Sequence, residues 1–257
     1  AQLTGALLAH LIAKIHLVSS PRAAEMTKLL ENIFRSVNIA LVNELMLLAE
    51  RMNIDIWAVI EAAKTKPFGF MPFYPGPGVG GHCIPVDPYY LSWKAREYDF
   101  YTKFIELAAE MNQAMPYHVV DLVSQALSQA GKPLDGAEVL ILGVAFKRDV
   151  DDARNSPAER IIELLLKQGA QISYSDPYVP RFRVGRDVFF PEECWLESVQ
   201  LTEEVLSTTD CVVIVAGHRA VDYAQVVRHA SVVVDAVNAT HDLSGPANVI
   251  RVGAPAH

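Results

Sequence analysis

The chain has 257 residues, of which 51% are apolar and 20% are charged, as expected of a globular protein with one or two domains. A formal net charge of −8 argues against binding to nucleic acid or to an anionic membrane surface, although a local cluster of cations can still hold an anionic small ligand. The cysteines are few and widely spaced, which predicts a reducing, cytoplasmic environment without a disulfide framework. They are Cys83, Cys194 and Cys211. The histidines show no ligand spacing either, so we expect no metal site.

The chain begins without a methionine, in the run AQLTGALLAHLIAKIHLVSSP. We expect a helix over residues 6–14 and an extended segment over 15–18. The run is too short and too polar to span a bilayer. We interpret residues 1–18 as the end of a preceding domain, and the chain as a fragment of a longer protein.

A long amphipathic helix is predicted from Pro21 to about Met52, because Ser20 provides an N-cap and Pro21 suits the first helical position. Apolar residues recur along it at intervals of three and four, and its length suits a dimer interface. Polar residues share one face through the same steps. A solvated face is one explanation, but the apolar faces around it favour an enclosed stripe. Its members are Glu25, Lys28, Asn32, Ser36 and Asn43.

A loop rich in glycine and proline follows, and it ends at Cys83 in the sequence FYPGPGVGGHCIPVDPYY. Its glycines permit positive φ and close approach of backbone N–H groups to a ligand. Residues 84–86 are predicted to form the first turn of a helix, which places Cys83 at a helix N-terminus that favours a thiolate. Asp87 would lie on the same face at i+4. The alternative is a structural cysteine in a turn, which is the more common role of a cysteine taken alone.

The pattern changes at residue 134. Continuous apolar runs predict buried parallel strands at 138–143, 171–175, 211–216, 231–235 and 249–252, and helices between them predict a doubly wound sheet. Residues 181–201 are expected to be irregular. The predicted fold class is therefore α/β, with an all-α central and dimerisation domain at 19–133 followed by a Rossmann-like domain at 134–257. The first strand ends in a lone Gly143, without a dinucleotide-binding glycine signature. The loop that follows it carries Lys147, Arg148 and Arg154.

Three segments in this order resemble the UDP-glucose/GDP-mannose dehydrogenase family: EMTKLLENIFRSVNIALVNE, PGPGVGGHCIPVDPYYL and ILGVAFKRDVDDARNSPA. Members of this family oxidise C6 of a nucleotide hexose twice, with NAD. The resemblance covers the central and C-terminal domains, and it lacks the NAD-binding domain, so we expect no turnover from this chain alone. His82 before the cysteine, with no lysine before Asp87, resembles the UDP-N-acetylhexosamine branch. A UDP-glucose dehydrogenase remains the alternative.

The resemblance implies roles for individual residues. Cys83 would capture the C6 aldehyde and then form a thioester. Lys28 and Asn32 would stabilise the oxyanion, and Asp87 would assist proton transfer. Arg154 would reach toward NAD. The residues implied in binding the UDP-sugar are Tyr74, Pro75, Gly76, Pro77, Gly78, Val79, Gly80, Phe146 and Lys147.

One position departs from the family pattern, because Val237 stands where an arginine is expected. Either Arg219 or Arg251 replaces it, or substrate binding is weaker. Two other functions remain open from the sequence. One is a non-catalytic, dimeric UDP-sugar-binding module, and the other is a structural unit that dimerises through the long helix. The sequence does not distinguish the epimers of the sugar.

Overall fold

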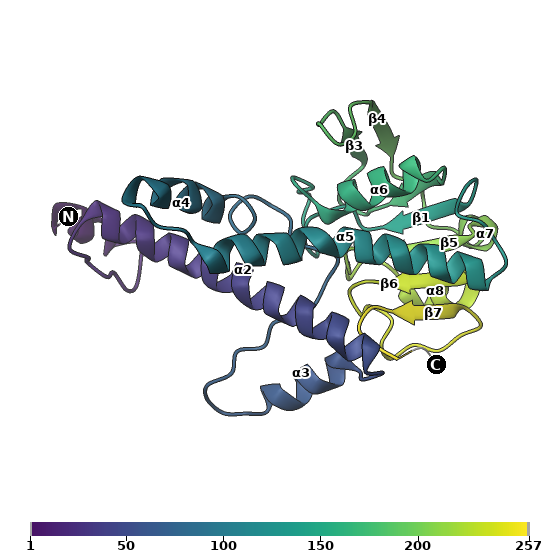
Figure 1. Ribbon diagram of the computed structural model, residues 1–257, viewed down its shortest axis with the longest axis horizontal. Coiled ribbons are helices and arrows are strands. Elements are labelled where there is room, and N and C mark those ends of the chain that lie inside the picture. The colour runs from purple at the N-terminus through teal and green to yellow at the C-terminus, as the bar shows by residue number, and fades with distance from the viewer. Residues whose placement is uncertain (1, 256–257) are drawn as a thin grey trace.

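The computed structural model describes residues 2–255. A helical part lies at one end of the molecule and a parallel sheet with its covering helices lies at the other, as Figure 1 shows. This arrangement confirms the predicted fold class. The helices of the first part are α1 (Gln2–Leu8), α2 (Pro21–Arg51), α3 (Ile56–Lys64), α4 (Asp87–Ala95), the short 3₁₀ helix η1 (Arg96–Tyr98) and α5 (Lys103–Gln129).

Helix α2 begins where the sequence predicts. The Ser20 side chain accepts a hydrogen bond from the Ala23 N–H at 3.2 Å, and Pro21 occupies the first helical position, where its missing N–H has no partner to lose. Asn32, Ser36 and Asn43 are buried along one face. The predicted polar stripe is thus enclosed over these three residues and exposed at its N-terminal end, at Glu25 and Lys28.

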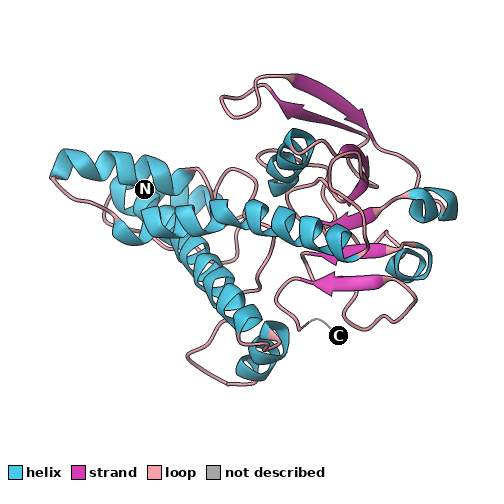
Figure 2. Cartoon of the chain, turned by 45° about the vertical axis from the view of Figure 1, so that its right-hand side comes forward, coloured by secondary structure: helices cyan, strands magenta, loops and turns pink. Residues whose placement is uncertain are grey.

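Helix α5 joins the two parts of the molecule. It packs against α2 and α4, and also against α6 (Pro157–Lys167) and the strands β5 (Cys211–Ile214) and β6 (Val232–Asp235) of the sheet. Met115, Val119, Val123 and Leu127 are fully buried at a spacing of four residues, as a helix with one apolar face requires. Figure 2 shows the helix passing from the helical part onto the sheet.

The sheet has five parallel strands in the order β2-β1-β5-β6-β7. Helices α5 and α6 pack with one set of strand residues and α7 and α8 with the alternate set, so both faces are covered, as the apolar strand sequences require. The strands are β1 (Glu138–Leu142), β2 (Gln171–Ser175), β5 (Cys211–Ile214), β6 (Val232–Asp235) and β7 (Asn248–Arg251), and the helices are α6 (Pro157–Lys167), α7 (Glu203–Thr208) and α8 (Tyr223–His229).

The segment after β2 was expected to be irregular, and this expectation is wrong. It forms an antiparallel hairpin of β3 (Arg181–Gly185) and β4 (Glu193–Glu197), in which Arg181 pairs with Glu197. Phe182 and Val184 are buried while Arg181 and Arg183 are exposed, which is the period of a strand covered on one face. Seven residues connect the two strands. The sequence therefore carries no signature of a short hairpin turn.

The N-terminal segment also differs from its prediction. Helix α1 begins at Gln2 rather than at residue 6, and residues 15–18 form no strand. A strand needs a neighbour to satisfy its backbone groups, and no strand pairs with this segment in residues 2–255. None of the residues of α1 is buried, so little packing holds the segment.

A carboxyl group is buried on α6. The Glu163 side chain is 1% exposed, and its only ion pair within residues 2–255 is with Arg160, at 2.9 Å. Neither carboxylate oxygen has a hydrogen-bond partner there. Burial raises the pKa of Glu163 to about 7, because the charged form loses its hydration. The residue lines a cavity of about 470 Å³ between α4, α5 and α6, behind Gly78 and Val79.

This burial predicts a pH-dependent stability. A carboxyl group whose pKa is raised on folding favours the folded state most below its unfolded value of 4.5, and this contribution is lost as the pH rises through about 7. Glu163→Gln, which cannot ionise, should therefore be more stable than the wild type at pH 8, by about 1–3 kcal/mol, and nearly equal at pH 4.5. Urea unfolding at both pH values measures the difference. The exposed control Glu192→Gln should show no such divergence, and an equal pH dependence in wild type and Glu163→Gln would refute the prediction.

Candidate active site

The loop before Cys83 is anchored to the two long helices by buried amides. The Asn43 side chain on α2 accepts a hydrogen bond from the Gly76 N–H at 3.0 Å and donates one to the Asn112 side chain on α5, also at 3.0 Å. Asn112 in turn donates to the Ser36 carbonyl at 3.2 Å. Buried polar groups stabilise only when they are paired, and each of these three side-chain bonds joins α2 to the loop or to α5.

The same loop is pressed against the sheet part. The Gly81 N–H donates to the Arg154 carbonyl at 2.9 Å, and the Asn155 amide donates to the Gly81 carbonyl at 3.0 Å. A Cβ atom added at Gly80 would lie 2.7 Å from the Phe146 Cβ and 2.9 Å from the Asn155 carbonyl oxygen. Glycine at 80 is therefore required by close approach, and the loop lies directly on the segment that follows β1.

Cys83 lies in a turn and not in the first turn of a helix. The Val86 N–H donates to the His82 carbonyl, but α4 begins only at Asp87. The expected helix start at residues 84–86 is thus wrong. Pro85 and Pro88 have no N–H group to continue the hydrogen-bond series through this segment. Cys83 is exposed and forms no disulfide, so its thiol is accessible to a reactant.

Asp87 is the centre of a polar cluster beside Cys83 in the sequence. Its carboxylate accepts a hydrogen bond from the Asn32 amide at 3.2 Å and lies 3.2 Å from the His82 ring nitrogen Nδ1. Arg35 donates to the Asn32 side-chain oxygen. The structure therefore brings together Asn32 and Asp87, as the sequence-based site requires. It adds Arg35 and His82, which sequence reasoning did not assign; the i+3 spacing of Arg35 from Asn32 was the available signal.

Lys28 is oriented away from this cluster. It lies one turn before Asn32 on α2, but its ammonium pairs with Glu31 at 3.3 Å and is largely exposed. Such a pair is weak in water, so the side chain is free to change rotamer. Within residues 2–255 no hydrogen bond or ion pair joins Lys28 to Cys83 or Asp87. The predicted oxyanion role of Lys28 needs a reorientation of this side chain.

The residues of the predicted sugar-binding loop differ in exposure. Tyr74 is partly exposed, stacks on Trp57, and donates its hydroxyl to Glu61 at 2.6 Å. In the rest of the loop, Pro75 and Pro77 are buried and the other residues are half-buried. This part of the loop comprises Pro75, Gly76, Pro77, Gly78, Val79 and Gly80.

The loop after β1 supplies cations. Phe146 is half-buried against Gly80 and Gly81, and Lys147 is exposed. The Arg154 guanidinium binds the Asp152 carboxylate at 2.6 Å. This pairing raises the pKa of Arg154.

The two arginines considered as replacements for Val237 are both engaged. Arg219 binds Asp149 at 2.6 Å, and Arg251 donates to the Asn238 side chain at 3.2 Å. A different arginine, Arg148, lies near Gly217, as Val237 does: a Cβ at Gly217 would lie 3.7 Å from the Arg148 Nη2 and 3.5 Å from the Val237 Cγ2.

The contact at Gly80 provides a test of the loop. Gly80→Ala should destabilise the chain by about 1–3 kcal/mol, since the added methyl group meets backbone and Cβ atoms that cannot yield without moving the loop. Gly76→Ala is the matched control, because a Cβ there meets nothing within 4 Å. Urea unfolding gives the stability, and the rate of Cys83 alkylation reports the loop position. Equal behaviour of the two variants would contradict this account of the loop.

Comparisons with known proteins identify two domains of one family in this chain. Residues 22–114 match the central domain, and residues 140–242 the UDP binding domain, of the UDP-glucose/GDP-mannose dehydrogenase family. A UDP-N-acetyl-D-mannosamine dehydrogenase of Methanocaldococcus jannaschii is 38% identical over 205 residues, which are 80% of this chain and 42% of that protein. A UDP-N-acetyl-D-glucosamine 6-dehydrogenase of Pseudomonas aeruginosa is 42% identical over 167 residues, 65% of this chain and 39% of that protein.

A solved structure shows the same fold. The UDP-D-ManNAc dehydrogenase of Pyrococcus horikoshii superposes with a TM-score of 0.84 and 29% identity, over 98% of this chain and 57% of that one. This chain spans less than half the length of the two curated relatives described above. The two family matches together cover more than half of its residues and follow the order of its helical and sheet parts, and the chain belongs to the UDP-glucose/GDP-mannose dehydrogenase family.

Proposed function

We propose that this chain provides the sugar-binding and thiol-bearing part of an enzyme that oxidises C6 of a UDP-N-acetylhexosamine to a carboxylate. The observation that carries the proposal is the position of Cys83. Its exposed thiol ends a loop that lies on the sheet part beside Phe146. Asp87, which accepts a hydrogen bond from Asn32, follows Cys83 by four residues in the sequence. Relatives named for UDP-N-acetyl-mannosamine and UDP-N-acetyl-glucosamine favour this sugar class over UDP-glucose.

The chain's own residues would act in two stages. The C6 hydroxymethyl group first loses a hydride and its hydroxyl proton to become an aldehyde. The Cys83 thiolate adds to this aldehyde, and the resulting thiohemiacetal, once protonated, loses a second hydride and a proton to become a thioester. Water then attacks the thioester carbonyl, which releases the carboxylate and restores the thiol. Asn32 can donate an N–H to the developing oxyanion, and Asp87, which already contacts Asn32 and His82, can accept or return the proton. Lys28 would add its charge after turning from Glu31.

NAD would accept the two hydrides. Residues 2–255 offer no complete site for it: Gly143 is enclosed by Ala216, with 2.5 Å between an added Cβ and the Ala216 carbonyl oxygen, and Arg154 is already bound to Asp152. We therefore assign no nicotinamide position to this chain, and propose that the dinucleotide is bound by another part of a longer protein. The free thiols suit the reducing conditions of the cytoplasm, where we propose that the protein acts.

Calorimetric titration with UDP and measurement of NADH formation test the proposal. The 257-residue chain should bind UDP, and Lys147→Gln should weaken that binding about tenfold, because a charge-assisted phosphate contact is lost. It should form no NADH from NAD and a UDP-N-acetylhexosamine, whereas the longer protein should. Cys83→Ser in the longer protein should stop uronate formation.

Three outcomes would contradict the proposal in different ways. Steady NADH formation by the 257 residues would refute the need for a further part. UDP binding by a longer protein without oxidation would favour a non-catalytic binding module. If the chain does not bind UDP, a purely structural role for it would be favoured.

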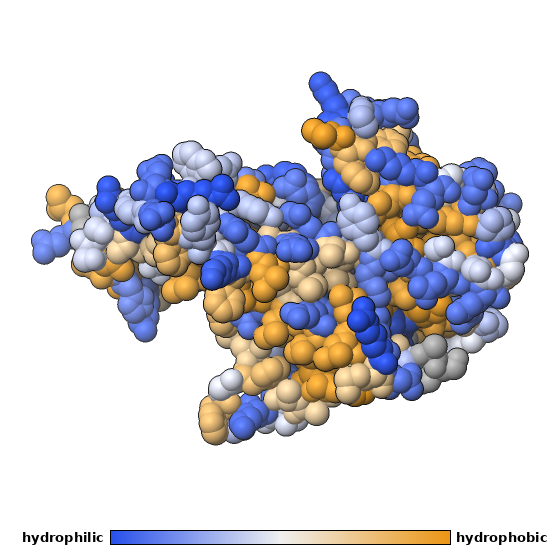
Figure 3. All heavy atoms as spheres, in the orientation of Figure 1, coloured by the Kyte–Doolittle hydropathy of each residue, from blue (hydrophilic) through white to orange (hydrophobic). Residues whose placement is uncertain are grey.

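We further propose that the chain forms a homodimer through α2. A stripe of apolar side chains on this helix is between 44% and 63% exposed, opposite the polar face buried against α5. Figure 3 shows apolar residues gathered over the lower part of the visible face, where α2 and α3 lie. By length and composition α2 would also pass for a membrane span, but its buried Asn43, which holds the active-site loop, favours pairing with a second copy. The stripe comprises Met26, Leu30, Phe34, Leu41, Leu45 and Leu48.

Charges placed in this stripe test the dimer. Leu41→Glu combined with Leu45→Glu should convert the dimer to a monomer in sedimentation experiments, because two identical stripes would bring four carboxylates together. The matched control is Leu243→Glu, at an exposed leucine outside α2, which should leave the dimer intact. A wild-type chain that sediments as a monomer would overturn this assignment.

A further inference from the structure

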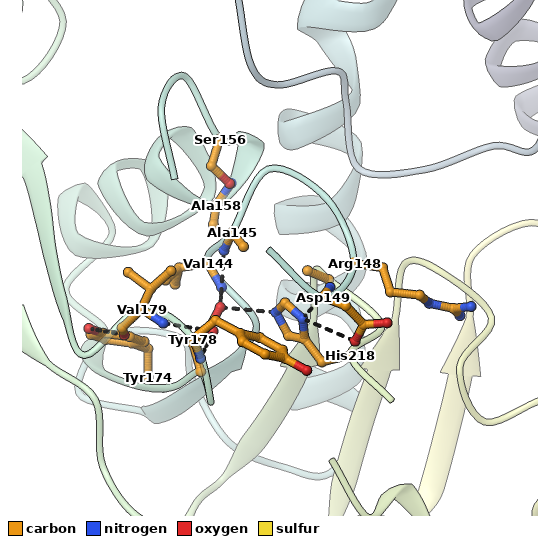
Figure 4. Close-up of polar contacts among 12 residues, drawn as sticks. Val144, Ala145, Arg148, Asp149, Ser156, Ala158, Tyr174, Tyr178, Val179 and His218 are labelled. Carbon is orange, nitrogen blue, oxygen red and sulfur yellow. Dashed lines mark hydrogen bonds and ion pairs between the residues drawn. The ribbon is translucent and has the colours of Figure 1, made fainter. Parts of the chain in front are cut away.

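We propose that Arg148 is an anion-binding residue of the nucleotide site, and that a buried Asp176–His218 pair positions it. The inference rests on the proposed binding of a UDP-sugar beside Lys147. Figure 4 shows the cluster, in which His218 lies between Asp149 and the residues that follow β1 and β2.

The first step is the location of the Arg148 guanidinium. Its Nε donates to the Gly217 carbonyl at 2.7 Å, and a Cβ atom added at Gly217 would meet both its Nη2, at 3.7 Å, and the Val237 Cγ2, at 3.5 Å. Arg148 follows β1, Gly217 follows β5 and Val237 follows β6. The guanidinium therefore joins the carboxyl ends of the neighbouring strands β1 and β5, with β6 next in the sheet, and this is the edge where parallel sheets bind ligands.

The second step concerns charge. Within residues 2–255, neither Lys147 nor Arg148 forms an ion pair with a carboxylate. The adjacent carboxylate, Asp149, is instead held by the backbone N–H of Arg219 at 2.9 Å and by its guanidinium at 2.6 Å. These bonds keep the pKa of Asp149 below its ordinary value. The charge of Asp149 is thus compensated by Arg219, and the adjacent Lys147 and Arg148 remain available to bind a diphosphate.

The third step is the anchor at the start of the loop. The Asp176 side chain is fully buried. Its Oδ2 accepts hydrogen bonds from the backbone N–H groups of Val144 and Ala145, at 2.7 and 3.0 Å. Its Oδ1 accepts from Tyr178 and Val179 at 2.8 and 3.1 Å. One carboxylate therefore fixes the chain immediately after β1.

His218 fixes the other end of the loop. Its Nδ1 accepts a hydrogen bond from the Asp149 N–H at 3.0 Å, and its Nε2 lies 3.0 Å from the Asp176 Oδ2. Because Nδ1 must accept and Asp176 can only accept, the proton lies on Nε2. The ring is fully buried, and both nitrogens are used. The backbone is thus held at residues 144–145 and at 149, and the side chains of Lys147 and Arg148 project from the segment between.

Substitution of Arg148 tests its role directly. Calorimetric titration with UDP and with uridine at fixed salt separates the phosphate contribution from that of the base. Arg148→Gln should weaken UDP binding about tenfold or more, the effect of one charge-assisted contact, and leave uridine binding within about twofold. Arg148→Lys should recover part of the loss. The control Arg228→Gln removes an equal charge at an exposed position of α8. It should change neither titration. Wild-type UDP binding with an unaffected Arg148→Gln overturns this inference alone, whereas a wild type that does not bind UDP overturns the proposed function with it.

A pair of amide variants tests the positioning by His218. In His218→Gln the amide nitrogen can replace Nε2 toward Asp176, but the acceptor for the Asp149 N–H is lost. In His218→Asn the amide oxygen can replace Nδ1 toward Asp149, but the bond to Asp176 is lost. Thermal unfolding should show that both variants lose stability. The ratio of UDP to uridine affinity should fall at least fivefold in His218→Gln and stay near wild type in His218→Asn. Equal ratios in the two variants would mean that His218 has only a structural role.

Discussion

The close contact between Gly80 and the loop after β1 is the constraint on which the arrangement of the site depends. The backbone of a flexible, glycine-rich segment touches Phe146 and Asn155 without an intervening side chain, and two hydrogen bonds at Gly81 fix the contact. Residues that are 60 or more positions apart in the sequence thereby become one surface. The thiol is placed at the end of this surface and the loop cations beside it, which is the geometry that a long, two-ended ligand such as a nucleotide sugar requires.

Buried polar groups, rather than apolar packing alone, hold the functional segments. Asn43 and Asn112 connect the loop to α2 and α5, and Asp176 with His218 connects the β1 loop to the neighbouring strands. Each group would be costly to bury without its partner. Such hydrogen-bond networks allow few alternative conformations. They therefore fix the positions of loops more precisely than contacts between aliphatic side chains do.

The parts of this structure that depend on local sequence patterns could be predicted from the sequence. The start of α2 followed from Ser20 and Pro21, the enclosed stripe from Asn32, Ser36 and Asn43, and the sheet from continuous apolar runs. The hairpin of β3 and β4 was missed because its long connection hides the pairing. The helix start near Cys83 was misplaced because two prolines interrupt the backbone bonds. His82 and His218 could not be assigned roles, since only the folded chain brings them to Asp87 and Asp176. Arg35 was missed although its partner Asn32 lies three residues before it on the same helix.

Helix α5 has a consequence for how the molecule unfolds. Its first half is covered by α2 and α4 and its second half lies on the sheet, so neither part retains a complete core if the other is lost. Fraying of one part would expose the buried methionine and valines of the shared helix to water. We therefore expect the two parts to unfold as a single cooperative unit, even though family matches divide the chain into two domains. We expect local opening first in peripheral segments such as α1, which buries no side chain.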